Sequence, residues 1–194
     1  MKVAVIGAGN MGGALARGLA KGSRIVTSDI YVSNPSTAKL EALKREFSDI
    51  NTSTDNCEVV RVADMVVLAV KPWKVEEVLA EIKPQLDYSR QAVASMVGGL
   101  GTAELSQWLD NGSGVLPPTY IIIPNTAIAT MSSMTFISSV RSTPQQDGLL
   151  LDIFNELGQA MLIDEGVMPA ATSLASCGIA YALRYVRAAM EGGV

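Results

Sequence analysis

The sequence predicts an α/β protein built on a doubly wound, mainly parallel β-sheet. Two observations predict this class. Short apolar runs alternate with segments of helical spacing along most of the 194 residues, and the first run, residues 1–6, ends at a glycine-rich turn. Alternating strands and helices favour a parallel sheet with helices on both faces over a sandwich or a helix bundle. A chain of this length can bury a substantial core.

The glycine turn has the spacing G-x-G-x-x-G at Gly7, Gly9 and Gly12, and helical spacing resumes over residues 13–20. In a Rossmann-like fold Gly7 makes the tight turn, Gly9 leaves room for a pyrophosphate, and Gly12 lets the helix lie close to the strand. The helix N-terminus also directs free N–H groups and a positive dipole end toward phosphate. We therefore expect a dinucleotide site here, and a purely structural turn is the alternative.

Composition excludes several other classes of protein. The net charge is −4, Lys and Arg are scattered, and His is absent, so we expect neither a nucleic-acid partner nor a metal site. Cys57 and Cys177 stand far apart, which suits reduced thiols in a cytoplasmic protein, with a disulfide as the alternative. We find no run of about 20 apolar residues and no signal peptide, so we expect no membrane partner.

The second strand decides which dinucleotide is expected. Residues 25–28 would end at Asp29, an acid suited to the ribose 2′-OH of NAD, whereas residues 30–33 would end at Asn34, leaving room for the 2′-phosphate of NADP. β-propensity favours residues 30–33, so we expect NADPH, with NADH as the alternative. Ser33, Asn34 and Ser36 could contact the 2′-phosphate or could only form a turn and a helix cap.

The remaining elements follow from periodicity and turn residues. The continuous apolar run 65–70 suits a strand buried on both faces, and the carboxyl ends of such strands line the ligand crevice. We therefore expect Lys71 beside the cofactor, and a solvated lysine is the alternative. We expect Gly22 to end the first helix in a left-handed cap, residues 52–56 to form a polar turn, and Thr102 to be an N-cap. The other expected strands are 92–97, 119–123, 134–140 and 160–163, and the other expected helices are 37–47, 59–63, 75–82, 102–109 and 149–157.

A long apolar helix is expected over residues 169–190. Small residues crowd its first half, and charges appear only at Arg184, Arg187 and Glu191. Such a helix should be buried against another helix, and a second copy in a homodimer or larger homo-oligomer would supply it. We therefore divide the chain into a dinucleotide-binding domain, 1–164, and the start of a truncated helical dimerisation domain, 165–194.

Several motifs together resemble pyrroline-5-carboxylate reductase, the enzyme of the last step of proline biosynthesis. Ala69-Val70-Lys71-Pro72 and Pro124-Asn125-Thr126 are more specific than the glycine turn, and further matches lie at 6–12, 32–36, 55–56 and 174–181. The resemblance implies NADPH-dependent reduction of Δ1-pyrroline-5-carboxylate to L-proline. A hydride would pass from nicotinamide C4 to the imine carbon, a reaction that needs positioning more than a strong acid.

The resemblance also implies site residues. The implied cofactor-binding residues are Gly7, Ala8, Gly9, Asn10, Met11, Gly12, Ser33, Asn34, Ser36, Asn56, Ala69, Val70, Lys71 and Pro72. The implied substrate-side residues are Asn125, Thr126, Ser176, Cys177 and Gly178, with Cys177 as a mere packing residue in the alternative.

The chain departs from the family pattern in two ways. The family's Leu-Ser-Gly-Ser-Gly-Pro-Ala-Tyr is replaced here by Leu-Ala-Ser-Cys-Gly-Ile-Ala-Tyr over residues 174–181, and family members continue with further helices. We therefore expect a C-terminally truncated chain that does not turn over substrate unaided. A related small-substrate NADP dehydrogenase and a non-catalytic NADP(H)-binding module are the alternative functions.

Overall fold

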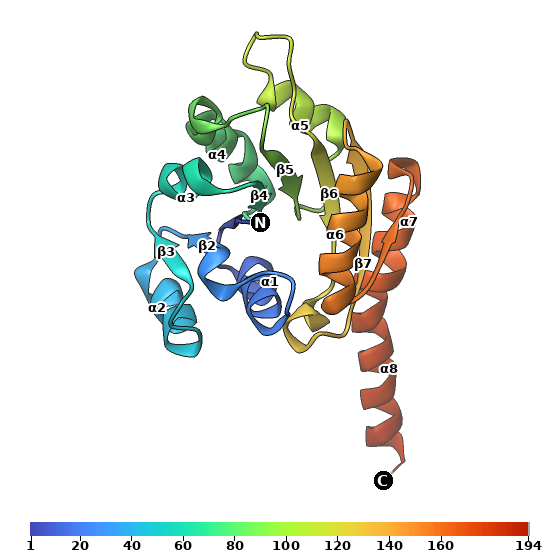
Figure 1. Cartoon of the computed structure of the whole chain (residues 1–194). Helices are drawn as coiled ribbons and strands as arrows, with labels where there is room; N and C mark the ends of the chain where they lie inside the picture. The colour runs from blue at the N-terminus through green and yellow to red at the C-terminus, as the bar shows by residue number, and fades with distance from the viewer. Residues whose placement is uncertain (194) are drawn as a thin grey trace.

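The computed structural model describes residues 1–193 and contains one eight-stranded sheet with the order β3-β2-β1-β4-β5-β6-β7-β8 (Figure 1). β6 and β7 pair antiparallel, and the other neighbouring strands pair parallel. The predicted doubly wound, mainly parallel sheet is therefore confirmed. The strands are β1 Val3–Ile6, β2 Ile30–Ser33, β3 Asn51–Ser53, β4 Met65–Leu68, β5 Ala92–Ser95, β6 Thr119–Ile123, β7 Ser133–Val140 and β8 Gly158–Leu162.

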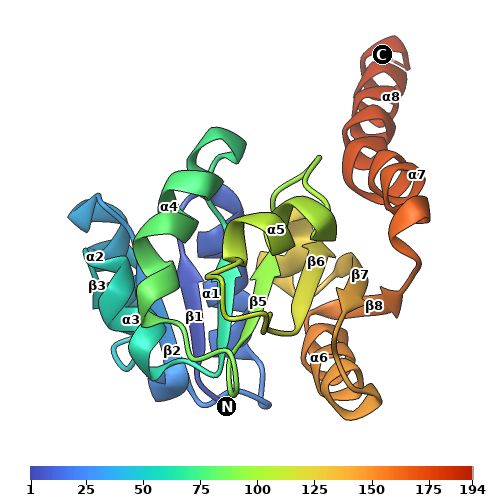
Figure 2. The same cartoon turned by 90° about the horizontal axis from the view of Figure 1, so that it is seen from above.

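Helices cover both faces of the sheet (Figure 2). Alternate residues of β1 point into two separate cores: Val3 and Val5 pack with α1, α2 and α6, whereas Ala4 and Ile6 pack with α3, α4 and α5. This two-sided burial explains why the strands are nearly continuous apolar runs. The helices are α1 Asn10–Lys21, α2 Thr37–Glu46, α3 Asn56–Val62, α4 Val75–Ile82, α5 Thr102–Leu109, α6 Pro144–Glu156, α7 Met168–Thr172 and α8 Gly178–Gly192.

The strand order reverses between β1 and β4, and this reversal positions the site. Ile6 at the end of β1 is in register with Ser33 on one side and with Leu68 on the other, and Leu68 is in register with Ser95. The residues that follow these four strands therefore meet at one edge of the sheet. In open α/β sheets such a switch point forms the ligand crevice.

The structure settles the choice of second strand. β2 spans Ile30–Ser33, as β-propensity predicts, and Thr27–Asp29 forms a short 3-10 turn instead. The expectation of a polar turn over 52–56 is wrong, because Asn51–Ser53 forms the edge strand β3. All three residues of β3 are half-buried, which suits their polar side chains at the edge of the sheet.

Gly22 ends α1 as predicted, but its left-handed conformation and the Thr102 N-cap are wrong, and at both places a carboxylate from a distant helix or turn binds the backbone. Gly22 has a φ of −70°, not a left-handed one; a Cβ there would lie 2.7 Å from Oε2 of Glu156, which accepts from Ser23 N at 2.9 Å. Thr102 is the first residue of α5 and Gly101 is its N-cap. The Thr102 N–H donates to Oε1 of Glu165 at 2.7 Å.

The C-terminal helix is continuous but differs from expectation in two ways. A π-helical turn, Ser173–Cys177, joins α7 to α8, and α8 stands away from the sheet (Figures 1 and 2). The expected burial is absent within one copy, since none of the described residues of α8 is buried. The anchor to the core is α7, through Met168 and Ala171.

The expectation that no segment has the length and apolarity of a membrane span is also wrong. The helical run Glu165–Gly192 is 28 residues long with a mean hydropathy of 1.3 in its most apolar window, and 6% of that window is buried. Alanines together with larger apolar residues such as Leu174, Ile179 and Leu183 give the run this hydropathy. Length and composition alone do not distinguish a membrane helix from one that packs against protein.

Candidate cofactor site

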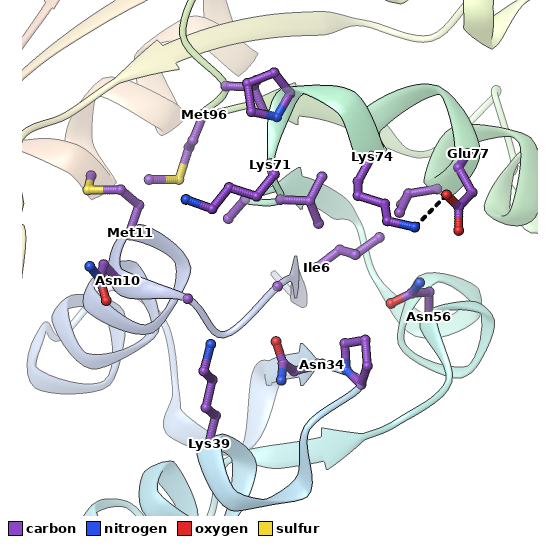
Figure 3. Close-up of a pocket in the computed structure, with 18 of the residues that line it drawn as sticks. Ile6, Asn10, Met11, Asn34, Lys39, Asn56, Lys71, Lys74, Glu77 and Met96 are labelled. Atoms are coloured by element: carbon purple, nitrogen blue, oxygen red, sulfur yellow. Dashed lines mark hydrogen bonds and ion pairs between the residues drawn. The ribbon is translucent and has the colours of Figure 1, made fainter.

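A cleft of about 750 Å³ lies at the carboxyl edge of β1, β2, β4 and β5 (Figure 3). Its walls come from the loops after these four strands and from one side of α4. Of the predicted cofactor residues it is lined by Gly7, Gly9, Asn10, Met11, Asn34, Asn56, Ala69, Val70, Lys71 and Pro72. The other four, Ala8, Gly12, Ser33 and Ser36, do not line it.

The glycine turn has the geometry that its spacing predicts. Gly7 has a φ of +103°, and a Cβ there would lie 2.7 Å from the Ala69 carbonyl oxygen. A Cβ on Gly12 would lie 1.9 Å from the Gly7 carbonyl oxygen, so α1 can approach β1 closely only with glycine here. A Cβ on Gly9 would meet no described atom within 4 Å. Because Gly9 lines the cleft, that space is open to a ligand.

The first turn of α1 faces the same cleft. Asn10 and Met11, its first two residues, line the cleft, and the first turn contains no acidic residue. Free N–H groups and the positive end of the helix dipole therefore point into the cleft with no nearby carboxylate on the helix to offset them. This end of α1 can hold an anionic group such as a pyrophosphate.

Asn34 joins the end of β2 to the glycine turn. Its Oδ1 accepts a hydrogen bond from Ala8 N at 3.0 Å, and its Nδ2 donates to the Ser36 carbonyl oxygen at 3.1 Å. Asn34 is 8% exposed. Both ends of the amide are therefore engaged within the protein, and Asn34 fixes the shape of the turn while also lining the cleft.

Ser33 contacts Asn56 instead of open solvent. Ser33 is fully buried, and its Oγ donates to Oδ1 of Asn56 at 2.7 Å. Nδ2 of Asn56 in turn donates to Oε2 of Glu81 at 2.8 Å. Ser36 is the N-cap of α2 but makes no capping hydrogen bond through its side chain.

Three lysines reach the cleft, and two of them were not anticipated. Lys39, in the first turn of α2, points toward Asn34 and the glycine turn (Figure 3). Lys74 Nζ forms an ion pair with Oε2 of Glu77 at 2.7 Å, whereas Lys39 and Lys71 have no ion-pair partner among residues 1–193. The sequence could have indicated Lys39 by its position, because a lysine in the helix after the second strand lies near the 2′-phosphate of NADP.

Comparison with known proteins identifies the chain. A family model described as NADP oxidoreductase, coenzyme F420-dependent, matches residues 2–99. Pyrroline-5-carboxylate reductase of Methanosarcina acetivorans is 30% identical over 194 residues, covering 100% of this chain and 70% of the relative. Pyrroline-5-carboxylate reductase 1 of Dictyostelium discoideum is 31% identical over 98% of this chain and 36% of its own length.

The chain belongs to the pyrroline-5-carboxylate reductase family. Solved structures agree: Plasmodium falciparum pyrroline carboxylate reductase with NADP bound has a TM-score of 0.86 at 27% identity, covering 100% of this chain and 69% of that chain. Pyrroline-5-carboxylate reductase of Coxiella burnetii has a TM-score of 0.88 at 27% identity, covering 99% and 70%. The reductase chain described here thus spans little over a third of the Dictyostelium relative and about 70% of the others.

The predicted substrate-side residues of this reductase are only partly brought together. Asn125 caps the turn after β6 by accepting from Ala127 N at 3.0 Å, and its Nδ2 donates to the Ala175 carbonyl oxygen at 3.3 Å. It therefore ties the sheet to the π-helical turn. Thr126 lies in a smaller hollow of about 470 Å³ that includes Gly9. Residues 176–178 line neither this hollow nor the cleft.

Cys57 follows Asn56 in α3, and its thiol is directed to the Glu81 carbonyl oxygen at 3.6 Å. Burial raises the pKa of the thiol, and the negative charges of Asp55 and Glu81 raise it further. The three ligand atoms lie within 4.8 Å of one another, but a thiol must lose its proton to bind a metal. Both Cys57 and Cys177 are free, so the disulfide alternative is wrong for this structure.

Proposed function

We propose that this chain forms the cofactor-binding portion of an NADPH-dependent reductase that converts Δ1-pyrroline-5-carboxylate to L-proline in proline biosynthesis. The observation that supports it most strongly is the cleft at the β1–β4 switch point, with an open glycine turn at its centre and an unpaired lysine beside β2. We assign residues 1–164 to the dinucleotide-binding domain and residues 165–194 to the start of a helical dimerisation domain.

Each part of the cleft suits one part of NADPH. The pyrophosphate fits over Gly9 and the N-terminus of α1, and Lys39 is the cation placed for the 2′-phosphate. The adenosine half fits beside Asn56. The nicotinamide then lies at the opposite end, where Met11 and Met96 lie near each other (Figure 3).

The protein's contribution to the reaction is positioning. When bound, NADPH supplies a hydride from nicotinamide C4 to the imine carbon beside the protonated nitrogen. The apolar side chains of Met11 and Met96 hold water away from the nicotinamide end of the cleft. The chain has no His, and this reaction needs none, because the iminium nitrogen already carries the proton that the product amine retains.

The test measures the rate of NADPH oxidation by the full-length reductase, as its cell makes it, with and without Δ1-pyrroline-5-carboxylate. We expect the imine to raise the rate by at least about 100-fold, since hydride transfer needs an acceptor held beside C4. 1-Pyrroline, which lacks the carboxylate, is the matched substrate control. A rate that does not change on adding the imine would contradict the proposal.

The altered segment 174–181 supports a second candidate, another NADP-dependent dehydrogenase of small substrates. Ile179 stands where the family pattern has proline, and Ala175 replaces a serine. Faster turnover of a different imine or of a hydroxy acid in a substrate panel would favour it. Tight NADPH binding with no turnover on the whole panel would favour the non-catalytic module.

We also propose a homodimer or larger homo-oligomer assembled through α8. Ile179, Leu183, Val186 and Met190 fall on one stripe of the helix, and Leu183, Val186 and Met190 are 65%, 52% and 70% exposed. A stripe of this kind is stable in water only when another apolar surface covers it.

We propose a cytoplasmic location, because Cys57 and Cys177 are free thiols and the cytoplasm keeps thiols reduced.

Val186→Glu tests the assembly. We expect the oligomer measured by light scattering to dissociate, because a carboxylate would be buried without a partner in the interface. Arg187→Gln, one residue away on the charged side of α8, is the control and should leave the assembly intact. A wild-type monomer at high concentration, or a monomer that sediments with lipid vesicles, would contradict the proposal.

A further inference from the structure

We propose that Glu81 selects the adenine base of the cofactor, its carboxylate oxygen Oε1 accepting a hydrogen bond from the exocyclic amine of adenine. The inference rests on the proposed function, since it requires that the cleft holds a nicotinamide dinucleotide. It adds a base-recognition role for a residue of α4 that no sequence motif indicated.

The place of the base follows from the rest of the cleft. The glycine turn takes the pyrophosphate, and Lys39 lies beside the end of β2, where the ribose must pass. The space beyond lies between the loop after β2 and the side of α4, and Pro35 and Val78 give it apolar surfaces. A flat base fits between such surfaces, with its polar edge toward Asn56 and Glu81.

A chain of hydrogen bonds holds Glu81 in place. Oγ of Ser33 donates to Oδ1 of Asn56 at 2.7 Å, and Nδ2 of Asn56 donates to Oε2 of Glu81 at 2.8 Å. Ser33 is fully buried at the end of β2, so the chain starts from a rigid part of the sheet. Asn56 is engaged at both ends of its amide, so it orients the carboxylate of Glu81 at the wall of the cleft.

Glu81 has a free acceptor oxygen and no cationic partner among residues 1–193, whereas the charge of the other acid in the cleft is paired with a lysine. The two glutamates that line the cleft from α4 are Glu77 and Glu81. Oε2 of Glu77 is paired with Lys74 Nζ at 2.7 Å, as Figure 3 shows. Oε1 accepts no hydrogen bond from residues 1–193 in either glutamate, but Glu81 has no ion-pair partner among these residues, so its negative charge is not offset. A free carboxylate oxygen beside a base favours a base edge that donates.

Adenine and hypoxanthine differ at this edge. Adenine presents an amine that donates, whereas hypoxanthine presents a carbonyl oxygen at the same position, which a carboxylate repels. A site built to accept a hydrogen bond rejects an analogue that cannot donate it there. Because Glu81 is exposed, we expect a modest preference, about fivefold to tenfold in Kd, for an exposed charge-assisted hydrogen bond.

The test compares binding of NADPH with that of its hypoxanthine counterpart, in which inosine replaces adenosine. Titrations use the wild-type chain, Glu81→Gln, and the matched control Glu77→Gln. The glutamine in Glu81→Gln keeps an oxygen to accept from Asn56 and gains an amide that can donate to the hypoxanthine carbonyl. We expect the wild type and Glu77→Gln to prefer adenine about fivefold to tenfold, and Glu81→Gln to lose this preference or to reverse it in favour of hypoxanthine.

Three outcomes would overturn the inference. These are equal binding of the two dinucleotides by the wild type, an unchanged preference in Glu81→Gln, and an equal loss of preference in Glu77→Gln, which would assign the effect to general negative charge. Failure of the wild type to bind either dinucleotide would overturn the proposed function as well. NADPH binding without a base preference would overturn only the role of Glu81.

Discussion

Gly9→Val is expected to lower the affinity for NADPH by at least about 100-fold, since a branched side chain would occupy the place of the pyrophosphate and cost several charge-assisted hydrogen bonds. The fold should be unaffected. Gly9 has a φ of −72° and a ψ of −166°, an extended conformation open to any residue, and a Cβ there meets no described atom within 4 Å. NADPH titration by fluorescence and a thermal melt measure the two effects separately.

Gly12→Ala is the matched control within the same turn. A Cβ at Gly12 would overlap the Gly7 carbonyl oxygen, so this variant should lower the Tm as well as NADPH binding. The contrast between a stable non-binder at Gly9 and a destabilised variant at Gly12 separates the binding role from the packing role. A Gly9→Val variant that binds NADPH as tightly as the wild type would show that the ligand does not cross the turn.

Lys39→Glu should weaken NADPH binding by about 10- to 30-fold while changing NADH binding by less than about twofold, because one near-surface charge beside the 2′-phosphate is worth about 1–2 kcal/mol. Lys39 reaches the cleft beside Asn34 and has no ion-pair partner among residues 1–193. Titrations of both dinucleotides at two salt concentrations measure the effect, which should shrink as salt rises.

Lys44→Glu gives the control for net charge. Lys44 lies on the same helix, α2, and its Nζ is directed to the Ser48 carbonyl oxygen at 3.5 Å, outside the lining of the cleft. The same change in total charge should therefore leave the preference for NADPH over NADH unaltered. If the Lys39 and Lys44 variants lose NADPH affinity equally, or if Lys39→Glu weakens NADH binding as much as NADPH binding, the 2′-phosphate does not lie beside Lys39.

Local features of the sequence predicted the geometry of the glycine turn and the position of the second strand correctly. Gly7 is needed for its positive φ, and Gly12 is needed because α1 lies close to the backbone of the turn. Both requirements are set within a few residues of the glycine itself. The second strand was chosen correctly over residues 25–28 because β-branched and aromatic residues favour a pleated, buried position. Asn34 lines the cleft as expected.

The features that sequence reasoning missed depend on contacts between distant residues. Gly22 ends α1 as predicted, but in an extended conformation, and the carboxylate of Glu156 binds the N–H of the next residue, Ser23. The Thr102 prediction is wrong because Gly101 is the N-cap, and Glu165, 63 residues away, binds the Thr102 N–H. Glu81 lies on α4, whose side faces Asn56 only after the sheet has formed. Propensity and periodicity carry no information about such pairings.

The burial of the C-terminal helix could not be predicted for a similar reason. The apolar character of residues 169–190 predicts a covered helix. Within one copy, however, Tyr185 and Met190 on α8 are 76% and 70% exposed. The covering surface is not provided by the sheet of the same copy, so the pattern could indicate the need for a partner but not its position.

The most direct test of the account uses two samples of NADPH, with deuterium at the pro-R or at the pro-S position of nicotinamide C4, each given to the reductase together with Δ1-pyrroline-5-carboxylate. The account predicts that only one of the two samples gives L-proline with a single deuterium at the former imine carbon, because the cleft holds the ring in one orientation. Proline with deuterium from both samples, proline without deuterium from both, or no proline at all would contradict it.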